Sequence, residues 1–484
     1  MKANFILLLL FVNTCFGQYP FLEINASDIQ SRWKIQDAYL IEDSKTNSYY
    51  AILEEDKVTH GFKFDSIGTL VNRITSEGLK RKYKEIIGHI IKNNKLLLIQ
   101  KNDKGNKFAY IQYDFTTGKT KEAEYDIEKR TDRFVESYCT SDRCIIYTID
   151  ISNNNSLKKW EYKIDGKSSV KEIFLTKQLR MSGIKDNYLS SYIIEAKGFT
   201  SNIDLVKVNN KIPNNIEITA NPNKMYEYEN GFVWTLDGDL EHTILLNFDY
   251  PEFEPKVRII KKSRLKNEWG GKSNSFLFED KIAQVMSNNK ELIVDIKSIE
   301  QPEDLIKTLR VGKKEEIEFK NSQILQEGSM YSFGSTRKME KTSKLLRKMS
   351  SQDNGISINR NKDKYHITIG GIRKQTSGGG MMMPGFGAVP MGTFGAMTVS
   401  FNPTFYAYGL YSNTGSTRIE CLFDKEFNHS EGEIEKNVFD RIDDYKEVNE
   451  RNIKVESITY FNNRVILGYL SLREDRYLFK SFDL

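Results

Sequence analysis

Short runs in which apolar and polar residues alternate recur along almost the whole chain, with a period of two residues rather than 3.6. Typical runs are residues 95–100, 108–113, 144–149 and 291–296. Such runs, bounded by Asn, Asp, Gly and Lys, indicate β-strands joined by tight turns. The chain has only 9 Pro, which suits many paired strands because proline cannot donate a ladder hydrogen bond. The pattern predicts an all-β protein.

Two-residue turns are marked at several of the expected strand junctions. They are Asn93-Asn94, Asp165-Gly166, Asp237-Gly238, Asn288-Asn289 and Asn462-Asn463. Asparagine and glycine tolerate the left-handed backbone that a two-residue hairpin needs. We therefore expect each pair to join two neighbouring antiparallel strands.

The expected strands fall into groups of four. First strands are expected near residues 38, 86, 135, 181, 226, 275, 356 and 455, and the first six starts are about 40–50 residues apart, near the period of propeller blades. The last group has three good strands, and the strand at residues 21–25 can supply its fourth and so close the ring. We predict a single β-propeller of seven or eight four-stranded blades. The alternative is two β-rich domains split near residue 320, where the repeat fails.

Two segments between strand groups have helical spacing instead. Residues 335–350 combine Met and Leu on one side with Arg and Lys elsewhere, and residues 438–449 place Phe, Ile and Val on a common face. Both are predicted as helical insertions into a propeller domain that covers residues 18–484. We expect the basic helix to pack through its Met and Leu side, with its lysines in water. The alternative is contact with an anionic membrane or an acidic partner.

The N-terminus has the pattern of a secretory signal peptide at residues 1–17. Lys2 precedes eight apolar residues at 5–12, far fewer than the ~20 that span a bilayer. Cys15 and Gly17 provide small residues at the −3 and −1 positions of a cleavage site. Lipoprotein anchoring at Cys15 is less favoured, because Thr14 stands where a small residue is usual. No later run predicts a transmembrane segment.

Composition narrows the class further. The chain has 28 Phe and 25 Tyr, enough to fill a large core, which argues against disorder. Its 71 basic and 66 acidic residues give a net charge of only +5 without a long basic stripe, so no nucleic-acid partner is expected. The Phe-Gly-Gln end of the signal and the Lys-, Asn- and Ile-rich composition resemble exported proteins of Bacteroidetes-type bacteria. That resemblance implies a periplasmic or extracellular location.

Cysteine usage leaves one candidate disulfide in the exported chain. Cys139 and Cys144 flank a predicted turn, so the two can face each other in a hairpin and bridge in an oxidising compartment. Two buried thiols fit the sequence equally well. Cys421 lies in an apolar strand pattern and is expected in the core.

Residues 377–397 form an uncharged tract of Gly and Met that matches no regular element. We predict a long apolar loop and a candidate interaction surface, because methionine adapts to varied partners. The expected contact residues are Met381, Met382, Met383, Phe386, Met391, Phe394 and Met397. Packing against the propeller itself, or Cu(I) binding by the thioethers, are the alternatives. No βαβ unit frames the tract, so no cofactor is expected.

A weak metal or acid–base candidate is the alternating set His429, Glu431 and Glu433, which would share one face of a strand. Because Gly432 interrupts the set, a solvated loop is the favoured interpretation and no metal is expected. The sequence contains no P-loop, nucleophile elbow or HExxH motif. The identity of any catalytic residue is unknown from the sequence.

These patterns favour an exported, non-enzymatic β-propeller that acts as a binding or scaffold module in the cell envelope, with an envelope protein or a polymer as its ligand. The alternative is a hydrolase or lyase that acts on an extracellular glycan or peptide at the propeller channel. The fold alone does not decide between them, because one fold hosts many chemistries.

Overall fold

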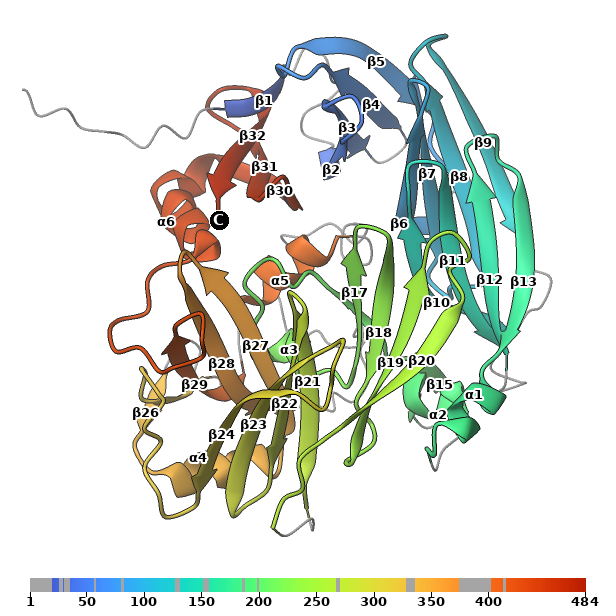
Figure 1. Cartoon of the computed structure of the whole chain (residues 1–484). Helices are drawn as coiled ribbons and strands as arrows, with labels where there is room; N and C mark the ends of the chain where they lie inside the picture. The colour runs from blue at the N-terminus through green and yellow to red at the C-terminus, as the bar shows by residue number, and fades with distance from the viewer. Residues whose placement is uncertain are drawn as a thin grey trace, which may run out of the picture.

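The computed structural model describes residues 20–25, 29, 35–55, 58–79, 82–126, 131–150, 156–184, 188–197, 200–266, 270–327, 336–373, 402–411 and 415–484. The predicted signal peptide and the predicted loop at 377–397 lie outside these ranges. In the described part of the chain, seven sheets of four or five strands follow one another around a common centre (Figure 1). The protein is a β-propeller, and each sheet is one blade.

Blades 1 to 3 are antiparallel meanders of four strands. Blade 1 contains β2 (Ile35–Asp43), β3 (Ser48–Glu55), β4 (Thr59–Phe64) and β5 (Leu70–Ser76). Blade 2 contains β6 (Tyr83–Lys92), β7 (Lys95–Asn102), β8 (Lys107–Asp114) and β9 (Lys119–Asp126). Blade 3 contains β10 (Asp132–Cys139), β11 (Arg143–Asp150), β12 (Ser156–Lys163) and β13 (Ser168–Phe174). First strands such as β2 are mostly buried, whereas last strands such as β13 are mostly exposed.

An irregular segment separates blade 3 from blade 4. It contains α1 (Thr176–Met181), α2 (Leu189–Ile193), β14 (Ile194–Lys197), β15 (Thr200–Ile203), β16 (Val206–Val208) and α3 (Ile216–Thr219). Blade 4 contains β17 (Asn223–Tyr228), β18 (Gly231–Leu236), β19 (His242–Asp249) and β20 (Pro255–Lys261). The short strand β16 pairs with β17 in parallel, so it extends blade 4 on the side of its first strand.

Blade 5 repeats the simple meander with β21 (Lys272–Phe278), β22 (Lys281–Ser287), β23 (Glu291–Ser298) and β24 (Leu305–Gly312). Blade 6 takes its outer strands from earlier in the chain. Its order is β27 (Asp353–Asn361), β28 (Lys364–Ile372), β29 (Ser416–Phe423), β25 (Ile324–Gln326) and β26 (Arg337–Met339). Helices α4 (Thr342–Met349) and α5 (Pro403–Tyr411) connect these strands.

Blade 7 joins the two ends of the chain. It contains β30 (Ile453–Phe461), β31 (Arg464–Ser471) and β32 (Arg476–Asp483), preceded by α6 (Val438–Asn449) and the 3-10 helix η3 (Glu450–Asn452). The N-terminal strand β1 (Pro20–Asn25) pairs antiparallel with β32, with Ile24 opposite Tyr477. The fourth strand predicted for the last blade is thereby confirmed.

Neighbouring blades meet through their first strands. Strand β2 contacts β30, β6 contacts β10, and β21 contacts β27. Apolar side chains on both sides of residue 320, such as Val285 and Ile356, belong to one buried cluster. The split into two domains near that residue is therefore not observed.

Two of the sequence predictions need correction. A strand group was expected to start near Met181, but that residue ends α1, and the segment forms the short helices α1 and α2 around the buried Leu179 and Leu189. The helix predicted over 335–350 is shorter than expected. Met339 is the buried residue of β26, opposite Ile324, so the helix begins only at Thr342.

Two predicted turns also differ. The connection at Asp237-Gly238 runs from Leu236 to His242 and that at Asn288-Asn289 from Ser287 to Glu291, so neither is a two-residue hairpin turn.

Other local predictions agree with the structure. The second predicted helix is α6, with the expected bounds. Asn93, Asn94, Asn462 and Asn463 all have positive φ, as their hairpin turns require. Among the described residues, no helix is long and apolar enough to cross a membrane.

Candidate functional site

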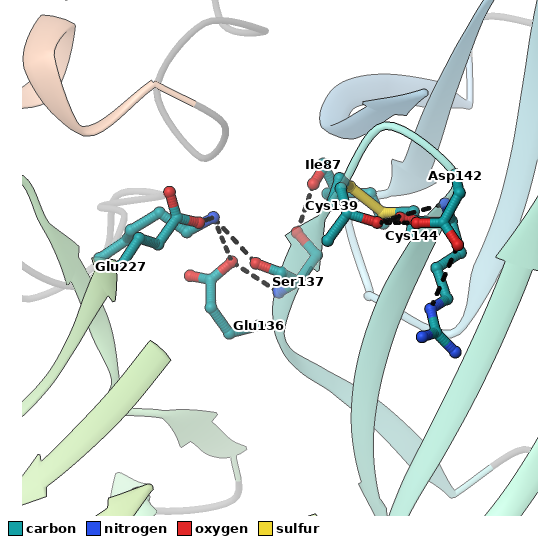
Figure 2. The surroundings of a disulfide bond; sticks show 10 residues. Ile87, Glu136, Ser137, Cys139, Asp142, Cys144 and Glu227 are labelled. Carbon is teal, nitrogen blue, oxygen red and sulfur yellow. Dashed lines mark hydrogen bonds and ion pairs between the residues drawn. A yellow bond between two sulfur atoms is a disulfide. The ribbon is translucent and has the colours of Figure 1, made fainter. Parts of the chain in front are cut away.

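A disulfide joins Cys139 and Cys144, which face each other at the end of the β10–β11 hairpin (Figure 2). The bond lies against Gly88 of β6. A Cβ atom at Gly88 would lie 2.2 Å from Sγ of Cys139 and 2.6 Å from Sγ of Cys144. Only glycine leaves room there, so the absence of a side chain lets the end of blade 3 approach the first strand of blade 2.

Next to the disulfide, one lysine is bound by two carboxylates. Lys207 of β16 places Nζ 2.9 Å from Oε1 of Glu227 in β17 and 3.8 Å from Oε1 of Glu136 in β10. The same Nζ donates a hydrogen bond to the carbonyl of Ser137 at 2.9 Å. The hydroxyl of Ser137 donates to the carbonyl of Ile87 in β6, as Figure 2 shows. This Lys207 cluster (Glu136, Ser137, Lys207 and Glu227) connects blades 2, 3 and 4.

Burial and charge oppose each other in the Lys207 cluster. Burial lowers the pKa of Lys207, but Glu227 and Glu136 together outweigh burial, and the pKa ends above its ordinary value. Burial raises the pKa of Glu136 above the ordinary value despite the nearby Lys207. Burial, assisted by the charge of Lys207, lowers the pKa of His89 in β6 to about 4. The ammonium is therefore stable, and His89 is neutral near pH 7.

A second buried cluster has the opposite composition, with two lysines that share one carboxylate. Nζ of Lys262 lies 3.2 Å from Oδ1 of Asp237, and Nζ of Lys224 lies 3.5 Å from Oδ2. All three side chains are fully buried. Asp237 also accepts hydrogen bonds from the hydroxyls of Ser275 at 2.6 Å and Thr243 at 2.7 Å. We call Lys224, Asp237 and Lys262 the Lys224 cluster.

The Lys224 cluster ties blades 4, 5 and 6 together. Lys224 donates to Oδ1 of Asn274 in β21 at 2.5 Å. Asn274 donates in turn to the carbonyl of Asn354 in β27 at 2.8 Å. All three are near the beginnings of the first strands of their blades, so a polar chain runs across two blade boundaries. Because Lys224 and Asn274 both find hydrogen-bond partners inside the protein, we interpret the arrangement as a structural connection between the three blades.

Burial dominates the pKa values of the lysines in this cluster. It lowers the pKa of Lys224 to about 8, because Asp237 compensates only in part. The pKa of Lys262 is lowered for the same reason. Burial works against the charged form of Asp237, but the two ammonium groups outweigh it and its pKa is lowered. One carboxylate thus forms ion pairs with two ammonium groups.

A cavity of about 400 Å³ opens beside the Lys224 cluster. Its walls come mainly from the turn after α1, the β18–β19 connection and the β20–β21 connection. The lining residues are Gly183, Ile184, Gly238, Asp239, Leu240, Glu241, His242, Ser263, Arg264, Leu265, Gly271, Lys272, Ser273 and Met286. Lys262 donates to the carbonyl of Asp239 at 2.7 Å and to Ser273 Oγ at 2.9 Å, so it braces two walls. The volume is within the range of small-ligand sites.

The centre of the ring contains helices α3 and α5 (Figure 1). Helix α3 contacts β27 and α5 contacts β30, which are the first strands of blades 6 and 7. Most of α5 is buried, including Phe405, Tyr406 and Leu410. Tyr408 donates a hydrogen bond to Asp443 of α6 at 2.5 Å and fastens α5 to that helix. Apolar and aromatic side chains of α5 are therefore buried against the inner strands of the ring.

The predicted site residues are not brought together into one centre. His429, Glu431 and Glu433 are exposed in the connection between β29 and α6. Nε2 of His429 is 3.0 Å from Oδ1 of Asn321, so the ring is held by an amide rather than by the two glutamates. In the ranges that the structure describes, no group of three or more His, Cys, Asp or Glu side chains could hold a metal ion. The predicted contact residues at 377–397 lie outside those ranges.

Sequence reasoning missed both buried clusters. Asp237 was expected only as part of a two-residue turn, and it instead begins the longer connection between β18 and β19. Nothing local sets Lys207, Lys224 or Lys262 apart from the many other lysines of the chain. Each lysine meets its carboxylate through the packing of strands, at sequence separations from 13 residues for Lys224 and Asp237 to 71 residues for Lys207 and Glu136.

The fold and site define a seven-bladed β-propeller with a helix-filled centre. No protein-family profile and no curated protein matches the chain. Among solved structures, it is similar to Hsv2 of Kluyveromyces lactis (7% identity, TM-score 0.31, 90% of each chain). It is also similar to an oligogalacturonate lyase in complex with manganese (8% identity, TM-score 0.30, 92% of this chain and 96% of that chain).

A third similar structure is the cobalt-substituted ACO of Synechocystis (9% identity, TM-score 0.30). The match covers 59% of this chain and 64% of that chain, so less than two thirds of that protein's length is spanned. At such identities and TM-scores, these similarities identify neither an activity nor a partner.

Proposed function

We propose that this protein is an exported, non-enzymatic β-propeller that serves as a binding or scaffold module in the cell envelope. The observation that supports the proposal is the position of two helices at the centre of the ring. Helices α3 and α5 lie there against first strands of the blades, and the side chains of α5 are mostly buried and apolar. A rigid ring with such a centre presents binding surfaces on its faces.

The contact segment proposed from the sequence is residues 377–397, with Met381, Met382, Met383, Phe386, Met391, Phe394 and Met397 as contact residues. The described elements on either side are β28, which ends at Ile372, and α5, which begins at Pro403 in the ring. An apolar, adaptable segment between two fixed elements suits a partner surface without a fixed shape. The partner class is an envelope protein or an envelope polymer.

The test is capture from native envelope extract by the tagged full-length chain, beside a deletion of residues 377–397. A matched control keeps the length of the segment and replaces its five Met and two Phe by Ser. We expect the full-length chain alone to retain a partner, with melting temperatures nearly equal in all three proteins. If the deleted form retains every partner, the contact segment is wrong. If no form retains anything, the binding role is wrong.

The Lys207 cluster favours one alternative, a hydrolase or lyase that acts on an extracellular glycan or peptide. Glu136 and Glu227 are both bound by the same ammonium, and only Glu136 is buried, with a raised pKa. Two carboxyl groups that differ in burial can take the separate roles of acid and base in such reactions. Turnover of glycan or peptide substrates that disappears in both Glu136→Gln and Glu227→Gln would favour the enzyme over the binding module.

A further inference from the structure

A cluster of cations follows strand β26 and helix α4 at the edge of blade 6. It consists of Arg337, Lys338, Lys341, Lys344, Arg347 and Lys348, which we call the basic face. Four of the six are exposed and Lys344 and Lys348 are half-buried. Within the described residues, none of these six charged groups forms an ion pair or a side-chain hydrogen bond. The face is therefore a source of uncompensated positive potential.

The helix that carries this face is held firmly from behind. Leu345, Leu346 and Met349 are fully buried against the blade, and Thr342 Oγ1 donates to the carbonyl of Glu315 at 2.6 Å. Lys341, Lys344 and Lys348 follow one another at helical spacings of three and four residues, which places neighbours about 5–6 Å apart on one side of α4. These three lysines therefore form a row along a helix that is anchored to the blade.

Three more exposed lysines lie beyond the basic face. The backbone N–H of Lys313 donates to the carbonyl of Lys290 at 2.7 Å, so these two exposed lysines adjoin each other. Lys290 lies in the turn between β22 and β23, and Lys313 begins the connection after β24 whose Glu315 carbonyl binds Thr342. Lys314 is also exposed and lies next along the chain. These three form no ion pair within the described residues.

Few acidic groups oppose these cations. Glu315 accepts the backbone N–H of Gly312 at 2.6 Å, and Glu316 lies 3.6 Å from Lys320. Glu318 and Glu340 are the other carboxylates of this region, and both are exposed. Positive charge remains in clear excess after these four groups are counted.

We infer that the basic face binds a linear acidic polysaccharide. Protein interfaces need an apolar centre and are poor in lysine, yet no large hydrophobic side chain is exposed among the described residues of 313–350. Stable insertion into a lipid surface needs an apolar face, and that of α4 is already buried. Single-stranded nucleic acid needs exposed aromatic platforms, and this surface has none in its described part. A polymer with an anionic group on each sugar can pair with successive cations in line.

This inference rests on the proposed binding function and names a polymer as one class of ligand, at a surface separate from residues 377–397. The probe is calcium-free sodium alginate, titrated into the full chain at 50 and 200 mM NaCl. Vesicles that contain one third anionic phosphatidylglycerol provide the membrane comparison, and neutral dextran provides the uncharged comparison. We expect alginate to bind and its dissociation constant to rise at least tenfold at the higher salt, because binding releases counterions.

The variant that tests the site is K341Q/K344Q/R347Q/K348Q, with K104Q/K107Q/K119Q/K121Q in blade 2 as a control of equal charge change. The first should weaken alginate binding at least tenfold, and the second less than threefold. Ser343→Lys adds a charge to α4 and should tighten binding, which tests the site even if the quadruple variant unfolds. Equal losses in both quadruple variants, or binding to vesicles in place of alginate, would overturn the inference. Capture of a protein through residues 377–397 without alginate binding would leave the proposed function standing.

Discussion

The Lys207 cluster and the Lys224 cluster contain similar groups in inverse proportion. In the first, one lysine lies between two glutamates, and the side chain of Glu227 is 42% exposed. In the second, two lysines share Asp237, and none of the three side chains is exposed. The pKa of Lys207 is raised, whereas those of Lys224 and Lys262 are lowered. The number of carboxylates per ammonium ion, and not burial alone, sets the direction in which the pKa of a buried lysine shifts.

The difference also separates two uses of buried charge. Water reaches one member of the Lys207 cluster, so its charges can rearrange or meet a ligand. The Lys224 cluster is sealed and supports the wall of a cavity, so a change there acts on the packing of three blades. This contrast predicts unequal costs when an equivalent partner is removed from each cluster.

The largest effect is expected for Asp237→Asn. The substitution leaves two fully buried ammonium groups without a carboxylate, and we expect the free energy of unfolding to fall by about 3–5 kcal/mol. Urea denaturation at pH 7 gives the measurement. A loss below about 1 kcal/mol would show that Ser275, Thr243 and the neighbouring carbonyls suffice to hold the lysines.

Removal of the disulfide beside the Lys207 cluster should have the next largest effect. Cys139 and Cys144 are five residues apart, and a loop of that size stabilises the folded chain by about 2 kcal/mol. The double variant Cys139→Ser/Cys144→Ser should lose this amount in urea denaturation. Treatment of the unmodified chain with dithiothreitol should lower the free energy of unfolding by the same amount.

When the double cysteine variant is combined with Asp237→Asn, the two losses in free energy of unfolding should add, because the two clusters share no partner. Strong non-additivity would mean that they act as one unit.

The two clusters should affect the pH dependence of the free energy of unfolding in opposite directions, because the pKa of Lys207 is raised and that of Lys224 is lowered. The folded pKa of Lys224 is about 8, below its ordinary 10.5. Between these values the unfolded chain binds more protons than the folded one, so the free energy of unfolding rises with pH across that window. The contribution is roughly 1 kcal/mol per pH unit. Lys224→Met should flatten this rise between pH 8 and 9.5, measured against the unmodified chain. If the variant and the unmodified chain show the same rise with pH, Lys224 is not the group with the lowered pKa.

The smallest effect is expected for Glu227→Gln. Its carboxylate is partly exposed, and Glu136 remains near Lys207, so the loss in free energy of unfolding should be below about 1 kcal/mol. The loss should shrink further in 0.5 M NaCl, because salt screens exposed pairs. Asp237→Asn should respond little to the same salt. A large, salt-independent loss for Glu227→Gln would remove the contrast between the clusters.

Most of the fold could be predicted from local alternation. The pattern placed the first strands of all seven blades close to where they lie, near residues 38, 86, 135, 226, 275, 356 and 455. It also identified residues 21–25 as the missing strand of the last blade. It failed at Met181, because a mixed segment of two short helices and a hairpin has about the length of a blade. It also failed at Met339, where one buried residue fits a strand end as well as a helix.

The Lys207 cluster and the Lys224 cluster could not be predicted from the sequence, for a physical reason. A lysine such as Lys207 becomes unusual only when β10 and β17 bring Glu136 and Glu227 to it from segments 71 and 20 residues away, as the hydrogen bonds and ion pairs record. Alternation reports which face of a strand is buried, but it does not report which strand lies opposite. The disulfide was accessible to reasoning because both cysteines belong to one hairpin.

The pairing of β1 with β32 has a consequence for how the chain is made. Six blades can form from neighbouring segments as these emerge, but the seventh needs the first strand and the last. Strand β1 therefore has no partner until β32 has formed, whichever route the chain takes as it is made. Removal of either strand leaves the same blade incomplete.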